Sequence, residues 1–475
     1  MLAAAEHWTA AVAVGGALYT WGHDDQDDHE QGRYGRLGHS YGHDVDVPTI
    51  VGDGLEGKCV VSVAVGRRHG AAVTSDGEVF TWGEYIYGNP GPDAPTLVRG
   101  VLEGKRILSV SAGTDFTTAL TSGGEVYTWD CGKCGAPGSE GFGDIDDLAD
   151  SRTLVGGGLV GKRVVGVSAS DSHSVAVTAD GEVFSWGEGD SGCLGHGNEE
   201  DVLTPKQVEG ILTGLHVVTV AVDDMHTAVV TREGRLFVWG ASYDFSLIST
   251  RTLVPTLVGG ALADKRVVGV SVGDSHMAAV TDAGECYTWG SGEWGRLGHG
   301  DTEHRFTPTL VTGALSGKRV VEVGAAASGG LHTAAVTLEG DLYTWGGGEW
   351  RAAMEYGFYS DLCKLGHGPI DDEEWYHVPR LVSSLTKWSV DPRLLVWSRA
   401  THLRFPRAFR DTVGALILAV NCTASAVASV DENPGRIIFE TQPPGLWGEG
   451  FAEVATSEPA ILAGQHRWHS HTQVS

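Results

Sequence analysis

A segment that ends in Trp-Gly recurs seven times along the chain, and this repeat constrains the fold more than any other feature. In one copy, Thr178–Gly187, two short apolar runs flank Asp180-Gly181 and the second run closes with Trp186. The seven tryptophans are Trp21, Trp82, Trp129, Trp186, Trp239, Trp289 and Trp345. A glycine stands five residues before each tryptophan. A spacing of about 50 residues in this many copies indicates a repeat architecture.

Each copy predicts a small antiparallel sheet. β-branched runs on both sides of pairs such as Asp-Gly are typical of a hairpin with a two-residue turn, in which glycine supplies the positive φ. Upstream lies another apolar run, such as Val164–Ser168, and downstream lies a segment with proline, such as Pro205–Val208. Proline is tolerated on edge strands, where no ladder N–H is lost. We therefore expect four antiparallel strands per unit, with each tryptophan buried between units.

Seven such units predict an all-β fold, a seven-bladed β-propeller of four-stranded antiparallel blades. The repeats occupy residues 1–385, and a short non-repeat C-terminal extension occupies residues 386–475. Leu2–Ala5 is interpreted as the second strand of its unit, which leaves the first blade without an edge strand. We expect the spare segment Pro379–Leu385 to supply that strand and to close the ring. A chain that lacks its true start is the alternative.

The C-terminal extension carries no repeat signal. Several arginines between Arg393 and Arg410 precede an apolar run, Val413–Val430, which is interrupted by small polar residues. We interpret the extension as a flexible, disordered tail. A membrane span over the apolar run is the alternative, because its length of about 18 residues is at the lower limit for crossing a bilayer.

The repeat resembles a known family. Gly273–Thr281, Tyr287–Gly290 and Gly295–Asp301 are similar to the regulator of chromosome condensation repeat, and Pro308 extends the match. The resemblance covers roughly residues 2–385 and implies a seven-bladed propeller. It leaves the role open, because the family includes a nucleotide-exchange factor for the small GTPase Ran, a plant UV-B photoreceptor and modules of large ubiquitin ligases.

The family roles can be weighed against these residues. The photoreceptor carries Gly-Trp-Arg-His-Thr motifs, whereas the matching positions here read Arg67-Arg68-His69 and Asp274-Ser275-His276, so that role is disfavoured. Ubiquitin-ligase activity requires a catalytic domain with a nucleophilic cysteine, for which residues 386–475 are too few. The exchange factor binds chromatin through a basic tail, whereas this chain has no such tail and a net charge of −28.

Charge is distributed unevenly over the expected disc. Because strand direction alternates, the loops after Trp-Gly lie on one face and the segments that precede the first apolar runs lie on the other. We expect the loops after Trp-Gly to be the blade-to-blade connections. They span 23–46, 84–94, 130–150, 188–201, 241–254, 291–307 and 347–378. They contain 31 Asp and Glu against 8 Lys and Arg. The opposite face receives Lys58, Lys105-Arg106, Lys162-Arg163, Lys265-Arg266 and Lys318-Arg319. An acidic face favours a basic protein partner and disfavours nucleic acid, whereas a merely solubilising surface is the alternative.

The acidic loops also carry candidate binding residues. Aromatic anchors inside a polar rim are typical of partner-binding surfaces. The candidate anchors are Trp294, Trp350, Trp375 and Tyr376. The candidate steering charges are Asp371, Asp372, Glu373 and Glu374. The alternative is that these aromatic side chains pack the long loops against the disc.

No motif predicts catalysis, a cofactor or a metal. One histidine per blade recurs in five blades, with Trp8 and Phe116 in its place elsewhere, and we interpret it as a structural hydrogen-bond donor or acceptor rather than a metal ligand. Cys131 and Cys134 have zinc-site spacing, but no second cysteine pair follows. Four loops contain Leu-Gly-His, which predicts a turn with glycine in a left-handed conformation.

These features predict a protein-interaction scaffold or regulatory module that is not an enzyme. One alternative is a guanine-nucleotide exchange factor for a small GTPase, and another is a substrate-recognition module associated with ubiquitin ligation. The start of the chain lacks the pattern of a secretory signal, and seven scattered cysteines favour a reducing compartment. We therefore expect a cytoplasmic or nucleocytoplasmic protein that binds another protein, without nucleic acid or membrane partners.

Overall fold

A computed structural model describes the chain as two compact units, Met1–Trp388 and Ser389–Ser475. In the first unit it describes residues 1–383 except 14, 25–34, 41–42, 86–88, 91, 114–115, 130–152, 242–251, 274, 327–330, 348–364 and 368–376. In the second unit it describes residues 426–430, 436–441 and 451–455.

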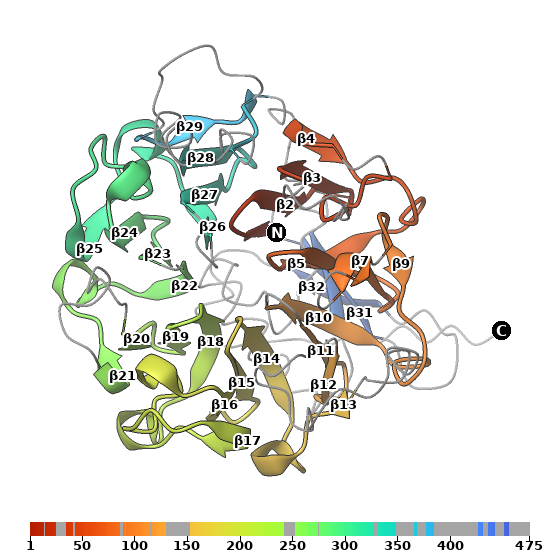
Figure 1. The fold of residues 1–475 in the computed structure, drawn as a ribbon, viewed down its shortest axis with the longest axis horizontal. Coiled ribbons are helices and arrows are strands. Elements are labelled where there is room, and N and C mark those ends of the chain that lie inside the picture. Colours follow the sequence, from red (N-terminus) through yellow and green to blue (C-terminus); the bar gives the residue numbers. More distant parts are fainter. Residues whose placement is uncertain are drawn as a thin grey trace. The chain divides into compact units, whose positions relative to one another are not determined.

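The first unit is a seven-bladed propeller in which the strands of each blade follow one another in the sequence (Figure 1). Blade one contains β1 (Leu2–Ala4), β2 (Trp8–Val12), β3 (Leu18–Gly22) and β4 (Val45–Ile50). Blade two contains β5 (Val60–Val65), β6 (His69–Thr74) and β7 (Val79–Tyr85), with β8 (Asn89–Pro90) and β9 (Thr96–Leu97) both paired to β7. Blade three contains β10 (Ile107–Ala112), β11 (Thr117–Thr121), β12 (Val126–Trp129) and β13 (Thr153–Leu154).

The remaining blades repeat this order. Blade four contains β14 (Val164–Ala169), β15 (His173–Thr178), β16 (Val183–Gly187) and β17 (Val202–Gln207). Blade five contains β18 (Val217–Val222), β19 (His226–Thr231), β20 (Leu236–Gly240) and β21 (Thr252–Leu257). Blade six contains β22 (Val267–Val272), β23 (His276–Thr281), β24 (Cys286–Gly290) and β25 (Arg305–Leu310). Blade seven contains β26 (Val320–Ala325), β27 (His332–Thr337), β28 (Leu342–Gly346) and β29 (Arg380–Leu381).

Short 3-10 turns lie in the connections. Before β14, β18, β22 and β26 lie η3 (Gly157–Leu159), η5 (Gly210–Leu212), η6 (Gly260–Leu262) and η8 (Gly313–Leu315). In the loops after two of the Trp-Gly pairs lie η4 (Asp190–Gly192) and η7 (Glu293–Gly295). In the part of the chain that the structure describes, no helix is long and apolar enough to cross a bilayer.

The seven repeated tryptophans form the core that the sequence predicts. Each is at most 3 % exposed. Trp239, for example, packs in one cluster with Val175 of blade four and Val229 of blade five, so its ring lies between neighbouring blades. Burying a side chain of this size is a large contribution to stability, which explains why the tryptophan recurs in every blade.

The turn of the repeated hairpin differs from the predicted two-residue turn. In blade four, Gly181 N donates to Thr178 O and Thr178 N donates to Glu182 O, both at 2.9 Å, so three residues form the loop. Only Gly181, with φ of 83°, has positive φ there. This is the three-residue hairpin in which a type I turn is followed by one left-handed residue. A Cβ on Gly181 would lie 2.5 Å from His216 Cα of the next blade, so close packing also requires glycine.

The predicted closure of the ring is wrong. Arg380 and Leu381 pair with Thr344 and Tyr343 of the same blade, and Leu2–Ala4 is the first strand of a complete blade one. The loop after Trp-Gly returns the chain alongside the strand that it has just left, so the proline-containing strand belongs to the preceding tryptophan strand. The Trp-Gly loops therefore connect strands three and four within a blade, and they are not blade-to-blade connections.

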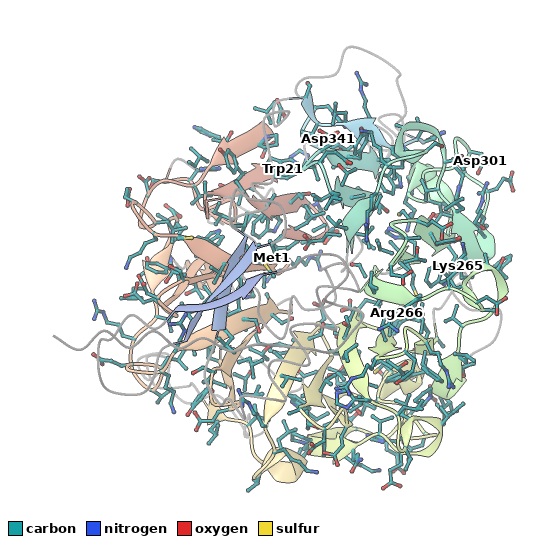
Figure 2. The ribbon with its side chains drawn as sticks, turned by 180° about the vertical axis from the view of Figure 1, so that it is seen from behind. Met1, Trp21, Lys265, Arg266, Asp301 and Asp341 are labelled. Atoms are coloured by element: carbon teal, nitrogen blue, oxygen red, sulfur yellow. The ribbon has the colours of Figure 1, made fainter. Side chains whose placement is uncertain are left out.

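Side chains close the ring instead of a shared sheet. Leu2 N donates to Glu322 Oε1 at 3.0 Å, and Thr9 Oγ1 lies 2.9 Å from His332 Nε2. Leu2 and Trp21 of blade one share an apolar cluster with residues of blade seven. Met1 and Trp21 are labelled in Figure 2, and Figure 1 shows the N-terminus on the inner side of the ring. The Thr9–His332 contact at this seam is of the same kind as the histidine–threonine contacts between blades two and three, four and five, and six and seven.

The second unit contains a three-stranded antiparallel sheet. Its strands are β30 (Ala426–Val430), β31 (Arg436–Thr441) and β32 (Phe451–Ala455). β30 contains the end of the apolar run that was considered as a membrane span, and residues 413–425 of that run lie outside the described residues. The flexible tail predicted for residues 386–475 therefore contains at least these three paired strands.

Candidate functional site

The strand order divides the connections of the propeller between two faces. The connections from strand one to two and from strand three to four lie on one face, which we call the loop face. The connections from strand two to three and from blade to blade lie on the other, which we call the hairpin face. The separation of acidic loops from Lys/Arg segments stays a prediction, and the corrected blade boundaries do not alter it, because moving the boundary by one strand leaves strand direction unchanged.

The lysines of the hairpin face are held in one repeated ion pair. Each lysine contacts a carboxylate in the hairpin of its own blade: Lys58–Glu78, Lys105–Glu125, Lys162–Glu182, Lys265–Glu285 and Lys318–Asp341. In blade six the hydrogen bond from Lys265 lowers the pKa of Glu285, and the same bond raises the pKa of Lys265. Figure 2 labels Lys265 and Arg266 of this face.

The arginines next to those lysines contact the preceding blade. Arg106 Nη2 donates to Ser75 O at 3.0 Å, and Arg319 Nη2 donates to Asp282 O at 3.0 Å. Arg163 and Arg266 make the equivalent bonds to Ser122 O and Arg232 O. The cations of the hairpin face thus join strands and blades to one another.

On the loop face, the blade-four loop carries acidic residues without lysine or arginine in the same loop. In the blade-four loop, residues 188–201 contain five Asp and Glu and no Lys or Arg. Glu199, Glu200 and Asp201 are exposed. One of these carboxylates also orders the loop, because Gly189 N donates to Asp201 Oδ1 at 2.9 Å.

Loop one holds a buried charged cluster that the sequence did not reveal. Asp24 is 4 % exposed and Arg36 is 3 % exposed. Burial raises the pKa of Asp24 to about 6, and the nearby Arg36 opposes that rise. Although burial raises the pKa of Asp44, hydrogen bonds from His23 and from Asp24 N outweigh it and lower the value. The acidic run 24–28 therefore begins inside the protein, and Asp25–Asp28 lie outside the described residues.

Among the predicted binding residues, the structure describes Trp294. It lies in η7, is partly buried, and has φ of 61° and ψ of 15°. Its neighbour Glu293 is exposed. Its other neighbour, Gly295, is buried and packs against His377 of blade seven. The residues outside the described part of the chain are Trp350, Asp371, Asp372, Glu373, Glu374, Trp375 and Tyr376.

The repeated histidine forms the predicted structural hydrogen bond in four blades. His173 Nε2 lies 2.9 Å from Thr227 Oγ1 of the next blade. The same contact joins His69 to Thr117, His276 to Thr333 and His332 to Thr9. Within the described residues no group of three or more His, Cys, Asp or Glu is arranged to hold a metal ion. Cys131 and Cys134 lie outside the described residues.

The Leu-Gly-His motif joins each of the four loops that contain it to two blades. In blade four, Ser185 Oγ donates to Leu194 O at 2.7 Å and lies 3.1 Å from His196 Nε2. Gly195, with φ of 76°, confirms the predicted left-handed glycine and packs against Trp239 of blade five. The loops that carry this motif therefore share a hydrogen-bonded base.

Comparisons with known proteins agree with this architecture. The family model described as "Regulator of chromosome condensation (RCC1) repeat" matches residues 15–73, 180–230 and 283–336, and a second model of the same description matches residues 164–193. The chain is similar to the human E3 ubiquitin-protein ligase HERC2, with 36 % identity over 96 % of this chain and 7 % of that protein. The chain thus spans a small part of HERC2.

A second relative is matched over most of its own length. The ultraviolet-B receptor UVR8 of Arabidopsis thaliana is 36 % identical over 76 % of this chain and 67 % of that protein. Among solved structures, yeast RCC1 (Prp20) bound to Kap60 is 20 % identical and covers 78 % of this chain and 84 % of its own, with a TM-score of 0.60. Human WBSCR16 is 23 % identical and covers 71 % and 84 %, with a TM-score of 0.58. At these identities the solved structures show the shared fold. The chain belongs to the regulator of chromosome condensation repeat family.

Proposed function

We propose that the propeller is a protein-interaction module whose loop face binds a protein with a basic surface. One observation carries the proposal: the lysines of the hairpin face are each paired with a carboxylate, whereas the blade-four loop of the loop face contains five acidic residues and no cation. Exposed charge of one sign accelerates association with a partner of opposite sign and disfavours nucleic acid.

The relatives suggest two more specific roles for such a module. The match to the ubiquitin ligase HERC2 extends over 470 residues, which reaches beyond the propeller into the second unit, whereas the match to UVR8 spans 364. A match of similar extent to the serine/threonine-protein kinase Nek9 of Xenopus laevis has 28 % identity, whereas the HERC2 match has 36 %, and this difference favours a substrate-recognition role in ubiquitin ligation as the second candidate. An exchange factor for a small GTPase has weaker support, because Prp20p of Saccharomyces cerevisiae, which binds Gsp1p and histones, shares only the fold with this chain at 21 % identity. In each role we propose binding without covalent catalysis, in the cytoplasm or shuttling between cytoplasm and nucleus.

The test compares the two faces in a pull-down from lysate. The loop-face variant is Glu199→Gln, Glu200→Gln and Asp201→Asn, which removes three charges and keeps the shape and the acceptor for Gly189 N. The matched control is Glu56→Gln, Glu103→Gln and Asp264→Asn, which removes three exposed charges from the hairpin face.

The loop-face variant is expected to lose partners, identified by mass spectrometry, that the wild type and the control retain. The association rate of a purified partner should fall and depend less on salt concentration. Equal recovery of partners by both variants would contradict the proposal.

A further inference from the structure

Two loops of the propeller share one backbone conformation and differ in the side chain that it carries. Ser191 and Trp294 have φ of 60° and 61°, and they are the non-glycine residues with positive φ in the described part of the chain. Each lies inside the same closed turn, with Gly192 N donating to Gly189 O and Gly295 N donating to Gly292 O, both at 3.0 Å. A bulky residue in this conformation is rare because its Cβ is crowded by the backbone. The repeat therefore supplies a fixed turn whose central residue varies.

The surroundings of Trp294 keep this turn in place. Gly292 N donates to His304 Nδ1 at 3.2 Å, so the start of the turn is bound to the segment before β25. A Cβ on Gly292 would lie 2.0 Å from Glu303 O, which shows how closely the two segments approach. On the other side, Gly300 N donates to His377 O of blade seven at 2.8 Å. Trp294 thus lies on a base that both blades six and seven hold.

The loop that contains Trp294 also carries exposed carboxylates. The side chain of Glu293 is 62 % exposed, and its oxygen is 3.9 Å from the guanidinium of Arg296, which is itself 4 % exposed. Glu303 is exposed. The cation of Arg305 is held by Asp301 through two bonds of 2.8 Å, which also lower the pKa of Asp301 to about 2. Asp301 lies at the outer edge of the ring in Figure 2.

An exposed aromatic pair lies where this loop enters β25. Phe306 on β25 is 55 % exposed, and its ring lies 6.5 Å from that of His304. We call Glu293, Trp294, Glu303 and Phe306 the blade-six tip. Its combination of aromatic side chains and exposed carboxylates differs from the blade-four loop, where Ser191 occupies the position of Trp294 and the exposed charges are Glu199, Glu200 and Asp201.

We propose that the blade-six tip recognises an arginine or lysine side chain in a basic segment of the partner protein. The indole face attracts the cation through its quadrupole, and the carboxylates of Glu293 and Glu303 provide ion pairs. The aliphatic part of the same side chain covers apolar surface of Trp294 and Phe306. This inference rests on the proposed function and assigns the part of the loop face that selects for arginine or lysine.

The probe is a fluorescein-labelled peptide of 15 residues in which arginine alternates with alanine, and the control peptide has glutamine for arginine. Binding of the full chain is followed by fluorescence anisotropy at low and moderate salt. The main variant is Trp294→Ser, because Ser191 shows that serine adopts the same conformation in the equivalent turn. Far-ultraviolet circular dichroism and the thermal midpoint of each variant establish that the fold is intact.

Trp294→Ser should weaken binding of the arginine peptide by roughly 3- to 30-fold, the range from an exposed to a desolvated cation–π contact. Glu293→Gln with Glu303→Gln should weaken it less and flatten its salt dependence. Ser191→Trp should strengthen binding, because it adds a second indole beside the acidic blade-four loop. Unchanged binding by Trp294→Ser would overturn the proposal, as would equal binding of the glutamine peptide to the wild type.

The outcomes also separate this inference from the proposed function. If Trp294→Ser binds normally while the triple variant of Glu199, Glu200 and Asp201 loses the peptide, the loop face binds basic segments but the blade-six tip does not select them. If none of these loop-face variants changes peptide binding, both proposals fail. Selective loss with Trp294→Ser, with the folds of all variants intact, supports both.

Discussion

The junction between blades four and five differs from the junction between blades five and six in the contacts that the repeated histidine makes. At the first, Thr227 Oγ1 lies 2.9 Å from His173 Nε2 and donates to Cys193 O at 2.8 Å. Trp239 Nε1 donates to the same carbonyl at 2.7 Å. Three segments therefore meet at one buried carbonyl oxygen.

At the second junction Met277 occupies the position of that threonine. His226 Nε2 is buried and has no hydrogen-bond partner among the described residues. Its other ring nitrogen lies 3.1 Å from both oxygens of Asp223, which is fully buried and also accepts from Met225 N and His226 N. Met277 instead packs in an apolar cluster with Val230 of blade five.

The difference shows that the ring tolerates two kinds of seam. Apolar packing of the repeated tryptophan is common to both, whereas the histidine–threonine bond is present in one and replaced in the other. A carboxylate next to the histidine orients the ring where the neighbouring blade offers no hydroxyl. Hydrogen bonds thus refine seams whose main stabilisation is hydrophobic.

The largest effect on this comparison is expected from Trp239→Ala. Removing the indole creates a cavity between blades and leaves Cys193 O with one donor fewer, so the free energy of unfolding should fall by about 3–5 kcal/mol. Urea unfolding followed by circular dichroism measures it. Trp239→Phe, which keeps most of the apolar surface and lacks the N–H, should cost much less, and equal costs for the two variants would show that packing is not the main term.

The second largest effect on this comparison is expected from acid, which should destabilise the first junction. Burial, followed by the nearby His226, lowers the pKa of His173 from 6.5 to about 3. The unfolded chain therefore binds a proton below pH 6.5 that the folded protein excludes, so this stabilisation is complete above pH 6.5 and is lost as the pH falls toward 3. The loss at pH 5 should be about 2 kcal/mol.

His173→Gln provides the control for the acid effect. Its urea midpoint should change less than that of the wild type between pH 7.5 and 5, because glutamine does not titrate and can still contact Thr227. The histidines of the Leu-Gly-His motifs titrate in the same direction, since burial lowers the pKa values of His196, His299 and His367 to about 4. A wild-type stability that is flat from pH 7.5 to 5 would contradict this prediction.

A smaller effect is expected from Thr227→Val. The substitution keeps the shape and removes the hydroxyl that joins His173 to Cys193 O, so it leaves buried polar groups with fewer partners and should cost about 1–2 kcal/mol. The loss is measured as a shift of the urea midpoint at constant slope. A cost near zero would mean that the hydrogen bonds of the Thr227 hydroxyl contribute no stability beyond that of packing.

The smallest effect is expected from Met277→Leu at the second junction. The two side chains have similar volume and neither forms hydrogen bonds there, so the cost should stay below about 1 kcal/mol. The comparison of the junctions requires that this cost be lower than that of Thr227→Val in the same assay. The reverse order would imply that the second junction depends on a shape that only methionine provides.

Much of the propeller could be predicted because the repeated glycine and tryptophan indicate where each hairpin turn and each buried side chain lies. The glycine five residues before each tryptophan is left-handed in all seven hairpins, and each tryptophan is buried. The strand at which each blade begins could not be predicted in the same way. In a closed ring of repeated hairpins, the sequence pattern is the same whichever strand is taken as the first. Only the observed pairing of Arg380 and Leu381 with β28 excluded the predicted closure.

The candidate site was predictable in part. The acidic bias of the loops is visible in the residues, and strand alternation alone assigns it to one face. Side-chain partners were not visible, so the pairing of Lys162 with Glu182 and the burial of Asp24 came only with the structure. A signal for the shared turn was present, because Gly189–Gly192 and Gly292–Gly295 have the same spacing of glycines.

The sequence by itself determined the number of blades and the hairpin positions, because these follow from local periodicity and turn chemistry. The tertiary structure alone decided which strand completes each blade, how the ring closes and which charges are already paired. These depend on contacts between residues far apart in the chain, such as Leu2 with Glu322, whose free energies depend on positions that no local pattern encodes.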